Sequence, residues 1–329
     1  MESKPSSLTV KDRAKRLLRD ANLILVFVII ALMAMSAFVS GGKAVKLLNI
    51  QNILGQVSSR GIASIGQLFV MLAGGIDISV GGMAQLSMCT GALVMSGKFG
   101  PTALAAGIGI MLLVGLAGGL INGLLVSRLG IVPLIVTLCM WLITEALTLV
   151  VTGPEKKIGD LPPGLAFFNG YILGVPVLFI IFIAVAVTAY FVLNYTSYGR
   201  SVYATGGNPV SAFLCGVDVK KIKLTTYAIS GFLAGLAGLA VTARSMSASG
   251  PLVGPLEFDT ITALSMGGVS FAGGSGGVVG SALGVIILGL IGNTMNLMKV
   301  AFPVQSAAKG AIILIAIVIY NLRQRKGRT

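Results

Sequence analysis

Long apolar segments separated by short polar ones run along almost the whole chain. The clearest ones lie at residues 22–40, 80–95, 102–126, 131–151, 172–193, 225–241, 278–298 and 306–320. Two shorter, glycine-interrupted segments lie at 62–75 and 260–274. A helix of about 20 apolar residues crosses the hydrocarbon layer of a bilayer. The pattern therefore predicts an all-α polytopic membrane protein with about ten transmembrane helices, some of them discontinuous.

The composition supports a membrane protein and argues against nucleic acid as a partner. Only 10% of the residues are charged and 55% are hydrophobic, whereas a soluble domain carries about 25% charged residues. The net charge is +14, but the cations lie between apolar segments and at both ends, as the positive-inside rule expects. A nucleic-acid groove would also need interleaved aromatic residues, and the sequence shows no such pattern.

The distribution of cations predicts the orientation. Residues 1–21 form a basic N-terminal arm and residues 322–329 a basic tail, so both termini are expected in the cytoplasm. An even number of spans then places the loop 194–224 on the cytoplasmic side as well. The transmembrane domain is expected to extend over residues 22–321.

The residue types that support catalysis or metal binding are scarce. The chain has no histidine, and Cys89, Cys139 and Cys215 show no metal-ligand spacing. We therefore expect no disulfide, no metal site and no cofactor. An intramembrane aspartyl protease would need two membrane aspartates, and Asp77 is the only good candidate. The protein is not expected to be an enzyme.

The segment Ala73-Gly-Gly-Ile-Asp-Ile-Ser-Val-Gly81 interrupts a long apolar region. Gly74 and Gly75 can end one helix through a positive φ angle. Asp77 or Ser79 can then accept from the free N–H groups that open the next helix. Asp77 has two interpretations, a helix cap or a residue of the substrate path or gate, because intramembrane carboxylates are costly and usually functional.

Weak internal similarity predicts two inverted repeats. The two short segments occupy corresponding places in the two halves, and residues 119–125 resemble residues 289–297. Paired discontinuous helices indicate a substrate path where the repeats meet. Asn122, Asn293 and Asn296 lie on apolar helices and should face the bundle interior, to bond between helices or to contact the polar groups of a solute.

The loop 194–224 contains a turn followed by a short helix. Gly206 and Gly207 mark the turn, Asn208 is expected to be the N-cap, and Pro209 to occupy the first helical position. A helix at residues 210–215 would then end at Gly216. It would present Phe213 and Leu214, either to a partner protein or to the membrane surface.

These features together resemble the permease subunits of ribose-type monosaccharide ABC importers, in the family shared with branched-chain amino acid permeases. The similarity rests on an ordered set of motifs: residues 73–81, Gly206-Gly-Asn208 with Gly216, Glu257-Phe-Asp259, Gly267-Gly268 and Gly273-Gly274. It extends over residues 22–320, nearly the whole chain. One departure concerns Glu145-Ala146, where sugar permeases of the family often carry Arg-Gly, and this puts the exact sugar in doubt.

The resemblance implies a set of partners in the bacterial cytoplasmic (inner) membrane. They are a second permease subunit in a homo- or heterodimer, cytoplasmic ABC ATPase subunits in the form of a tandem ATPase, a periplasmic or lipid-anchored sugar-binding protein, and membrane lipid. The loop 194–224 would seat in a groove of the ATPase. The chain has no Gly-x-x-x-x-Gly-Lys-[Ser/Thr] motif, so ATP must be hydrolysed by another subunit.

Three groups of residues are candidates for the transport machinery. The ATPase-coupling residues are Arg200, Gly206, Gly207, Asn208, Pro209, Phe213, Leu214 and Gly216. The helix-break and translocation-path residues are Gly74, Gly75, Asp77, Ser79, Gly81, Asn122, Glu145, Asn293 and Asn296. The extracytoplasmic gate or docking residues are Arg244, Glu257 and Asp259.

Local alternatives remain for two of these carboxylates. Glu145 would line an outer vestibule, pair with a cation such as Arg244, or extend toward the outer membrane surface. Asp259, directly before Thr260, is expected to be a helix N-cap.

Two alternatives to sugar import also stay open. An ABC permease of this kind could carry another small polar solute, namely a branched-chain amino acid, a nucleoside or an autoinducer-type sugar derivative. A secondary transporter driven by an ion gradient is also built on inverted repeats, but it would need no docking loop and would work alone.

Overall fold

The computed structural model describes residues 21–98, 100–153, 157–301, 303–308, 310–311 and 314. Its main helices are α2 (Ala21–Val39), α3 (Leu47–Leu72), α4 (Val80–Met95), α5 (Pro101–Ser127), α6 (Pro133–Thr152), α7 (Val177–Tyr195), α8 (Ser197–Gly207), α9 (Pro209–Leu214), α10 (Val219–Ser245), α11 (Leu256–Met266) and α12 (Val278–Leu297). Short 3-10 turns occur at η1 (Lys43–Val45), η2 (Pro163–Phe167) and η3 (Gly250–Leu252). A small antiparallel hairpin pairs β1 (Tyr171–Ile172) with β2 (Val175–Pro176).

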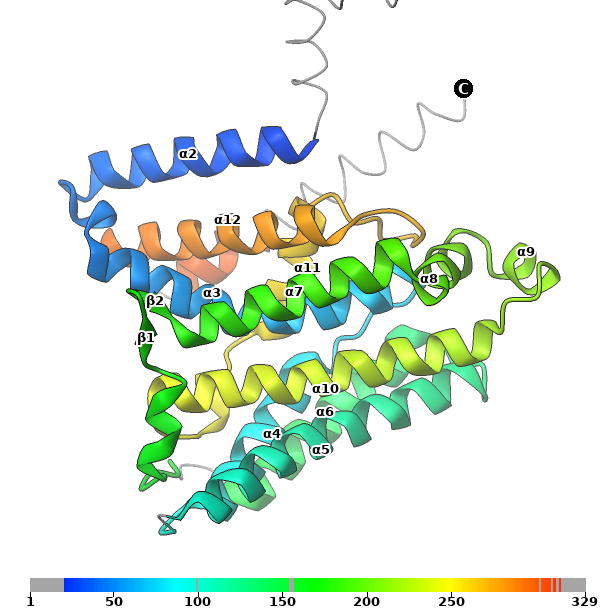
Figure 1. The fold of residues 1–329 in the computed structure, drawn as a ribbon, viewed down its shortest axis with the longest axis horizontal. Coiled ribbons are helices and arrows are strands. Elements are labelled where there is room, and N and C mark those ends of the chain that lie inside the picture. The colour runs from blue at the N-terminus through cyan, green and yellow to red at the C-terminus, as the bar shows by residue number, and fades with distance from the viewer. Residues whose placement is uncertain are drawn as a thin grey trace, which may run out of the picture.

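Six helices of the described residues are long and apolar enough to cross a membrane: α2, α5, α6, α7, α10 and α12. Figure 1 shows α2, α12, α7 and α10 with nearly parallel axes, and α7 runs in the opposite direction to the other three. This arrangement fits an all-α polytopic membrane protein. The predicted segment at 306–320 lies largely outside the described residues, as do the N-terminal arm before Ala21 and the tail 322–329.

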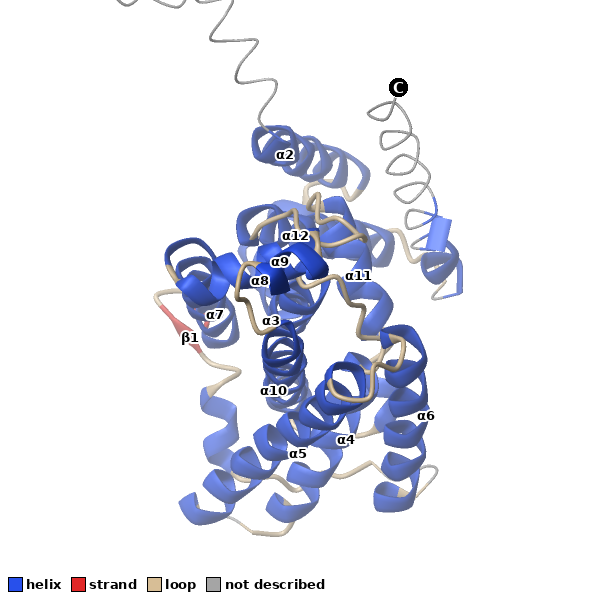
Figure 2. Cartoon of the chain, turned by 90° about the vertical axis from the view of Figure 1, so that its right-hand side faces the viewer, coloured by secondary structure: helices blue, strands red, loops and turns tan. Residues whose placement is uncertain are grey.

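Helix α3 corrects the prediction of a short span at 62–75. It is a continuous helix of 26 residues that begins at Leu47, and only its second half matches the predicted segment. The first half was missed because it carries polar residues such as Asn52, Gln56 and Arg60. Figure 2 shows α3 between α7, α10 and α12, and Gln56 and Arg60 are half-buried there, whereas Asn52 is exposed.

Helix α11 corrects a second boundary. It has 11 residues and ends at Met266, and a glycine-rich loop at residues 267–277 replaces the rest of the predicted span. The helix begins at Leu256 after Pro255. Asp259 therefore lies in the first turn, and the prediction that it is the N-cap is wrong. The prediction for α7 started too early as well, because the hairpin occupies residues 171–176.

Close backbone contacts hold the centre of the bundle together. Helix α10 packs against α3 on one side and against α5 on the other. A Cβ atom at Gly231 of α10 would overlap the carbonyl oxygen of Gly115 and lie 2.7 Å from the Cα of Gly119, both on α5. In a lipid environment such close approach of small residues is a main source of helix association.

The helices leave two distinct ends of the molecule. One end, which we call the α8–α9 end, carries α8, α9, the connection between α5 and α6, and the first turns of α10 and α12 (Figure 1). The opposite end, called the hairpin end, carries η1, the β-hairpin and the connection between α10 and α11.

Candidate functional site

The helix break after α3 forms as the glycine pattern predicts. Gly74 has a φ of 80°, and α3 ends at Leu72 just before it. Asp77 is fully buried. Its Oδ1 accepts hydrogen bonds from the backbone N–H of Ser79, at 3.0 Å, and from the Ser79 hydroxyl. Its Oδ2 accepts from the hydroxyl of Ser230 on α10, at 2.9 Å. Asp77 thus caps the turn between the helices.

The side chain of Ser79 does not cap α4, although Ser79 occupies the N-cap position. Its hydroxyl donates to Asp77 and accepts from Asn122 Nδ2 of α5, at 2.8 Å. The prediction that either residue would accept from the first N–H groups of α4 is therefore wrong in detail. Both side chains instead connect the break to neighbouring helices.

Other helices hold the backbone of the break in place. The amide of Gln67 on α3, oriented to satisfy both of its groups, donates to the carbonyl of Asp77 at 3.1 Å and accepts from its N–H at 3.2 Å. The Tyr227 hydroxyl of α10 donates to the carbonyl of Ile76, at 3.3 Å. The sequence interpretation missed Gln67, Tyr227 and Ser230, whose only signal is a polar group within an apolar helix.

The predicted Asn208 cap and the short helix at the α8–α9 end are confirmed, but Gly206 and Gly207 are the last two residues of α8, so the prediction that they form the turn is wrong. Asn208 Oδ1 accepts from the N–H groups of Val210 and Ser211, each at 3.0 Å, and Pro209 is the first residue of α9. Gly216, with a φ of 85°, follows the end of the helix. The helix α8, which precedes Asn208, was not predicted.

Helix α9 presents apolar side chains outward. Phe213 is 68% exposed and Leu214 is 79% exposed, and Val210 beside them is 68% exposed. Arg200 on α8 is exposed as well. Exposed apolar side chains on a short helix, with an exposed cation on the preceding helix, form a surface suited to a protein partner.

Four glycines join α8 to the two irregular segments of the membrane domain, and we call them the glycine junction: Gly74, Gly206, Gly273 and Gly274. A Cβ atom at Gly206 would overlap the carbonyl oxygen of Leu72, at the end of α3. That same oxygen accepts from the N–H of Gly274, at 3.0 Å. A Cβ at Gly273, whose φ is 88°, would lie 2.7 Å from the Cα of Gly74.

A tyrosine reinforces the glycine junction. The Tyr203 hydroxyl of α8 donates to the carbonyl of Gly276, at 2.9 Å. Burial raises the pKa of Tyr203 above its usual value, so the hydroxyl stays protonated and keeps donating. The α8–α9 segment therefore contacts, through backbone and one side chain, both the break after α3 and the loop after α11.

The predicted gate residues do not form one cluster. Asp259 pairs with Arg60 of α3, with 2.8 Å between Oδ2 and Nε. Glu257 is buried beside α4, where a Cβ at Gly81 would overlap its carboxylate. Arg244 is exposed, and within the described part of the chain no ion pair joins it to Glu145, so that predicted pair is not formed.

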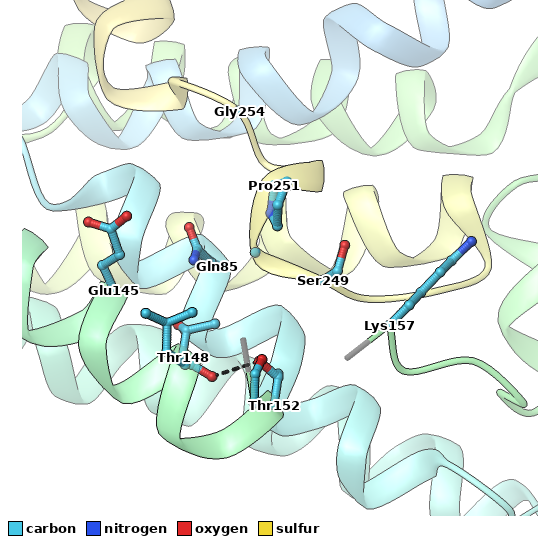
Figure 3. A pocket seen from close by; sticks show the side chains of 11 residues that line it. Gln85, Glu145, Thr148, Thr152, Lys157, Ser249, Pro251 and Gly254 are labelled. Atoms are coloured by element: carbon cyan, nitrogen blue, oxygen red, sulfur yellow. Dashed lines mark hydrogen bonds between the residues drawn. The ribbon is translucent and has the colours of Figure 1, made fainter. Parts of the chain in front are cut away.

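Glu145 lies at a polar pocket of about 380 Å³ at the hairpin end. The pocket lies between α4, α6 and the loop that contains η3. Figure 3 shows Gln85 of α4 between Glu145 of α6 and Pro251 of the η3 loop. Thr148 and Thr152 continue the wall along α6.

The three asparagines are used between structural elements rather than gathered at the pocket. Asn293 of α12 and Asn49 of α3 exchange amide hydrogen bonds, at 3.1 and 3.0 Å. Asn296 Oδ1 accepts from Gln305 Nε2 at 2.9 Å. Together with the bond from Asn122 to Ser79, the Asn293 contact agrees with the interpretation that these asparagines link helices inside the bundle. Asn296 is exposed, so the prediction that it faces the bundle interior is wrong.

The sequence matches a protein family described as the branched-chain amino acid transport system permease component, over residues 49–320. The chain belongs to this permease family. The permease is 36% identical to the ribose import permease protein of Haemophilus influenzae, over 83% of this chain and 85% of that protein. It is 36% identical to the ribose import permease protein of Bacillus subtilis, over 83% of this chain and 84% of the relative.

A relative named for a different sugar is similar to the same degree. The D-allose transport system permease protein of Escherichia coli is 38% identical, over 83% of each chain. No solved structure matches the permease. These relatives are transport permeases rather than enzymes, and they confirm the resemblance to ribose-type ABC permeases that the motifs indicate.

Proposed function

We propose that this permease forms the membrane pathway of a bacterial ABC importer for a monosaccharide and is driven by separate ATPase subunits. The similarity to ribose and allose import permeases supports the solute class. The observation that carries the coupling is the glycine junction, because it places Gly206 of α8 against Leu72 and Gly274 at once.

The geometry supports a specific route for the motion. The exposed face of α9, formed by Val210, Phe213 and Leu214, seats in a groove of the ATPase. Closure of the ATPase pair on ATP then displaces α8. Gly206 has no side chain, so the backbone of α8 lies directly against Leu72 and Gly274. A displacement of α8 therefore displaces the end of α3 and the loop after α11 together. The break after α3 and the loop after α11 are the segments that can change their angle.

The proposal includes the orientation and the remaining partners. The α8–α9 end, with Arg200, Lys220, Lys221 and Lys223, lies in the cytoplasm of the inner membrane, as the positive-inside rule favours. The hairpin end receives the sugar-binding protein. Two permease subunits, identical or different, share one central path above a tandem ATPase.

We further propose that about ten spans form two inverted repeats. The first repeat consists of α3, α4, α5 and α6, and the second consists of α10, α11, α12 and the segment at 306–320. The packing of α5 on α10 and of α12 on α3 supports this correspondence. The similar stretches 119–125 and 289–297 then fall on the equivalent helices α5 and α12.

Reconstitution tests the proposed function. The permease is purified with the ATPase that co-purifies with it and placed in sealed proteoliposomes with a sugar-binding protein encoded beside it. Uptake of labelled D-ribose or D-allose should require both ATP and the binding protein. Uphill uptake by the permease alone, driven by an ion gradient, would instead show a secondary transporter, and uptake of leucine but of neither sugar would refute the solute class.

A further inference from the structure

Two polar side chains at the pocket of the hairpin end have no bonding partner among the described residues. The side chains of Gln85 and Glu145 face the pocket, and neither forms a hydrogen bond or ion pair with another described residue. Lys157 and Ser249 line the same space. An amide, a carboxylate, an ammonium and a hydroxyl around one cavity offer both donors and acceptors.

The backbone keeps the Gln85 amide open to this space. A Cβ atom at Gly250 of η3 would lie 2.5 Å from Gln85 Nε2, so any larger residue there would press against the amide. The glycine leaves the amide free to bond with something other than protein. The cavity, at about 380 Å³, lies within the usual size range of small-molecule sites, about 300–1,000 Å³.

One helix connects the pocket to the helix break. Thr137, Trp141, Glu145, Thr148 and Thr152 follow one another at helical spacing along one face of α6. At one end of this face Thr137 donates to the carbonyl of Ile76, in the break after α3, at 3.4 Å. At the other end Thr152 lines the pocket. This face of α6 thus extends from the pocket at the hairpin end to the break after α3, the segment that is proposed to move with α8.

The chemistry of the lining selects among small solutes. Leu149 and Pro251 are the two apolar side chains among the lining residues, and polar side chains outnumber them, so the branched side chain of an amino acid would meet Gln85, Glu145 or Lys157 as well. An anion would lie close to the Glu145 carboxylate. A neutral solute with several hydroxyl groups can donate to Glu145 and the Gln85 carbonyl and accept from the Gln85 amide and Lys157.

We propose that this pocket is a transit site that binds a neutral polyhydroxylated solute of monosaccharide size after its release at the hairpin end. This inference rests on the proposed function and adds a sugar-contacting site within the permease itself. Gln85 and Glu145 make the contacts that distinguish one sugar from another. Selectivity is then shared between the binding protein and the membrane subunit.

Protection of a cysteine tests occupancy without requiring transport. Ser249→Cys is made together with Cys139→Ser and Cys215→Ser, which remove the exposed thiols and leave the buried Cys89. The full-length permease in sealed vesicles is treated with a membrane-impermeant maleimide applied to the hairpin end. Millimolar D-ribose or D-allose should slow labelling several-fold, whereas leucine should not.

The control is Leu173→Cys in the same background, since Leu173 is fully exposed at the tip of the hairpin. Sugar should leave its labelling unchanged. Equal slowing at both positions, no slowing at Ser249→Cys, or labelling of Ser249→Cys only from the α8–α9 side would each overturn the transit site.

Substitution of the contacting residues tests selectivity in the assembled importer. Gln85→Leu and Glu145→Gln should each change the ratio of allose to ribose uptake several-fold, because each alters contacts with particular hydroxyls. Thr188→Val on α7, where the exposed hydroxyl bonds only to its own helix at 2.8 Å, is the control and should leave the ratio unchanged. An equal fall in uptake of both sugars would show a structural role and refute the proposal.

The two proposals fail in different ways. If the unmodified complex imports sugar but the sugar neither protects Ser249→Cys nor depends on Gln85 and Glu145 for selectivity, the transit site is wrong and the importer stands. If the unmodified complex imports no sugar with ATP and binding protein present, the proposed function is wrong.

Discussion

Arg60 and Asp259 form an ion pair inside the helical bundle, with Arg60 Nε 2.8 Å from Asp259 Oδ2. The pair joins the long helix α3 to the short helix α11. The Asp259 side chain is 4% exposed and that of Arg60 is 27% exposed, so solvent screens the interaction only in part. The contact therefore fixes the position of α11, which is too short to span a membrane and has the glycine-rich loop directly after it.

The ion pair gives the first prediction. Arg60→Met leaves the Asp259 carboxylate without this partner in a buried place, and loss of one partner of a buried pair costs about 3–5 kcal/mol. The variant should lose most of its thermal stability in detergent, measured by size-exclusion chromatography after heating. The exchange Arg60→Asp with Asp259→Arg should recover part of the loss. Equal stability of Arg60→Met and the unmodified protein would show that the pair does not hold α11.

The glycine junction distinguishes two adjacent residues. A Cβ at Gly206 would overlap the Leu72 carbonyl oxygen, whereas a Cβ at Gly207 would meet no atom within 4 Å. Gly206→Ala should reduce ATP-dependent uptake at least tenfold, because α8 can no longer pack against the end of α3. Gly207→Ala is the matched control and should retain most of the uptake.

Membrane insertion must be measured alongside uptake in these variants. Both proteins should reach the membrane in similar amounts by immunoblot, since the contact lies between segments that are already formed. Full uptake by Gly206→Ala, or equal loss in the two variants, would contradict the role of the junction.

Asp77 gives a third prediction, which distinguishes a hydrogen-bonding role of its side chain from a role of its negative charge. Asn at this position can still accept from Ser79 through its amide oxygen, while its amide N–H₂ donates to Ser230. Leu leaves these buried donors unpaired, at about 1–3 kcal/mol each. Asp77→Asn should therefore keep more than half of the uptake and nearly all of the stability, and Asp77→Leu should lose both.

The opposite result would identify a different role for Asp77. If both variants fold by size-exclusion chromatography but neither transports, the negative charge itself takes part in transport. The matched control is Ser230→Ala, which removes one hydrogen bond to Asp77 Oδ2 and leaves the charge in place.

How much of this architecture the sequence predicts depends on how continuous each apolar segment is. The long helices α2, α5, α6, α7, α10 and α12 were all predicted, because each contains an extended apolar segment, whether it is mostly exposed like α2 or mostly buried like α10 and α12. Helix α3 was predicted only in its second half. Protein surrounds it, so its first half can carry Asn49 and Arg60, whose partners are supplied by other helices.

The same distinction applies to the site. Asn208 was predicted as a cap because its partners lie two and three residues away. Asp77 was predicted to cap the next helix, but its bond to Ser230 joins residues 153 positions apart, and no local rule supplies such a pair. The close approach of Gly206 to the Leu72 carbonyl was missed for the same reason, since only the packing of α8 on α3 creates it.

The exposed face of α9 leads to the last prediction. Phe213→Ser with Leu214→Ser removes the apolar side chains that protrude at the α8–α9 end but leaves the Asn208 cap and Gly216 in place, so the helix should still form. The variant should insert normally and lose at least tenfold in the amount of ATPase that co-purifies with it, because buried aromatic and aliphatic anchors dominate protein interfaces. Leu173→Ser, at the opposite end and fully exposed, is the control and should retain the ATPase. If the α9 variant keeps its ATPase and its ATP-dependent uptake, this helix lies on the membrane surface and the energy enters the permease elsewhere.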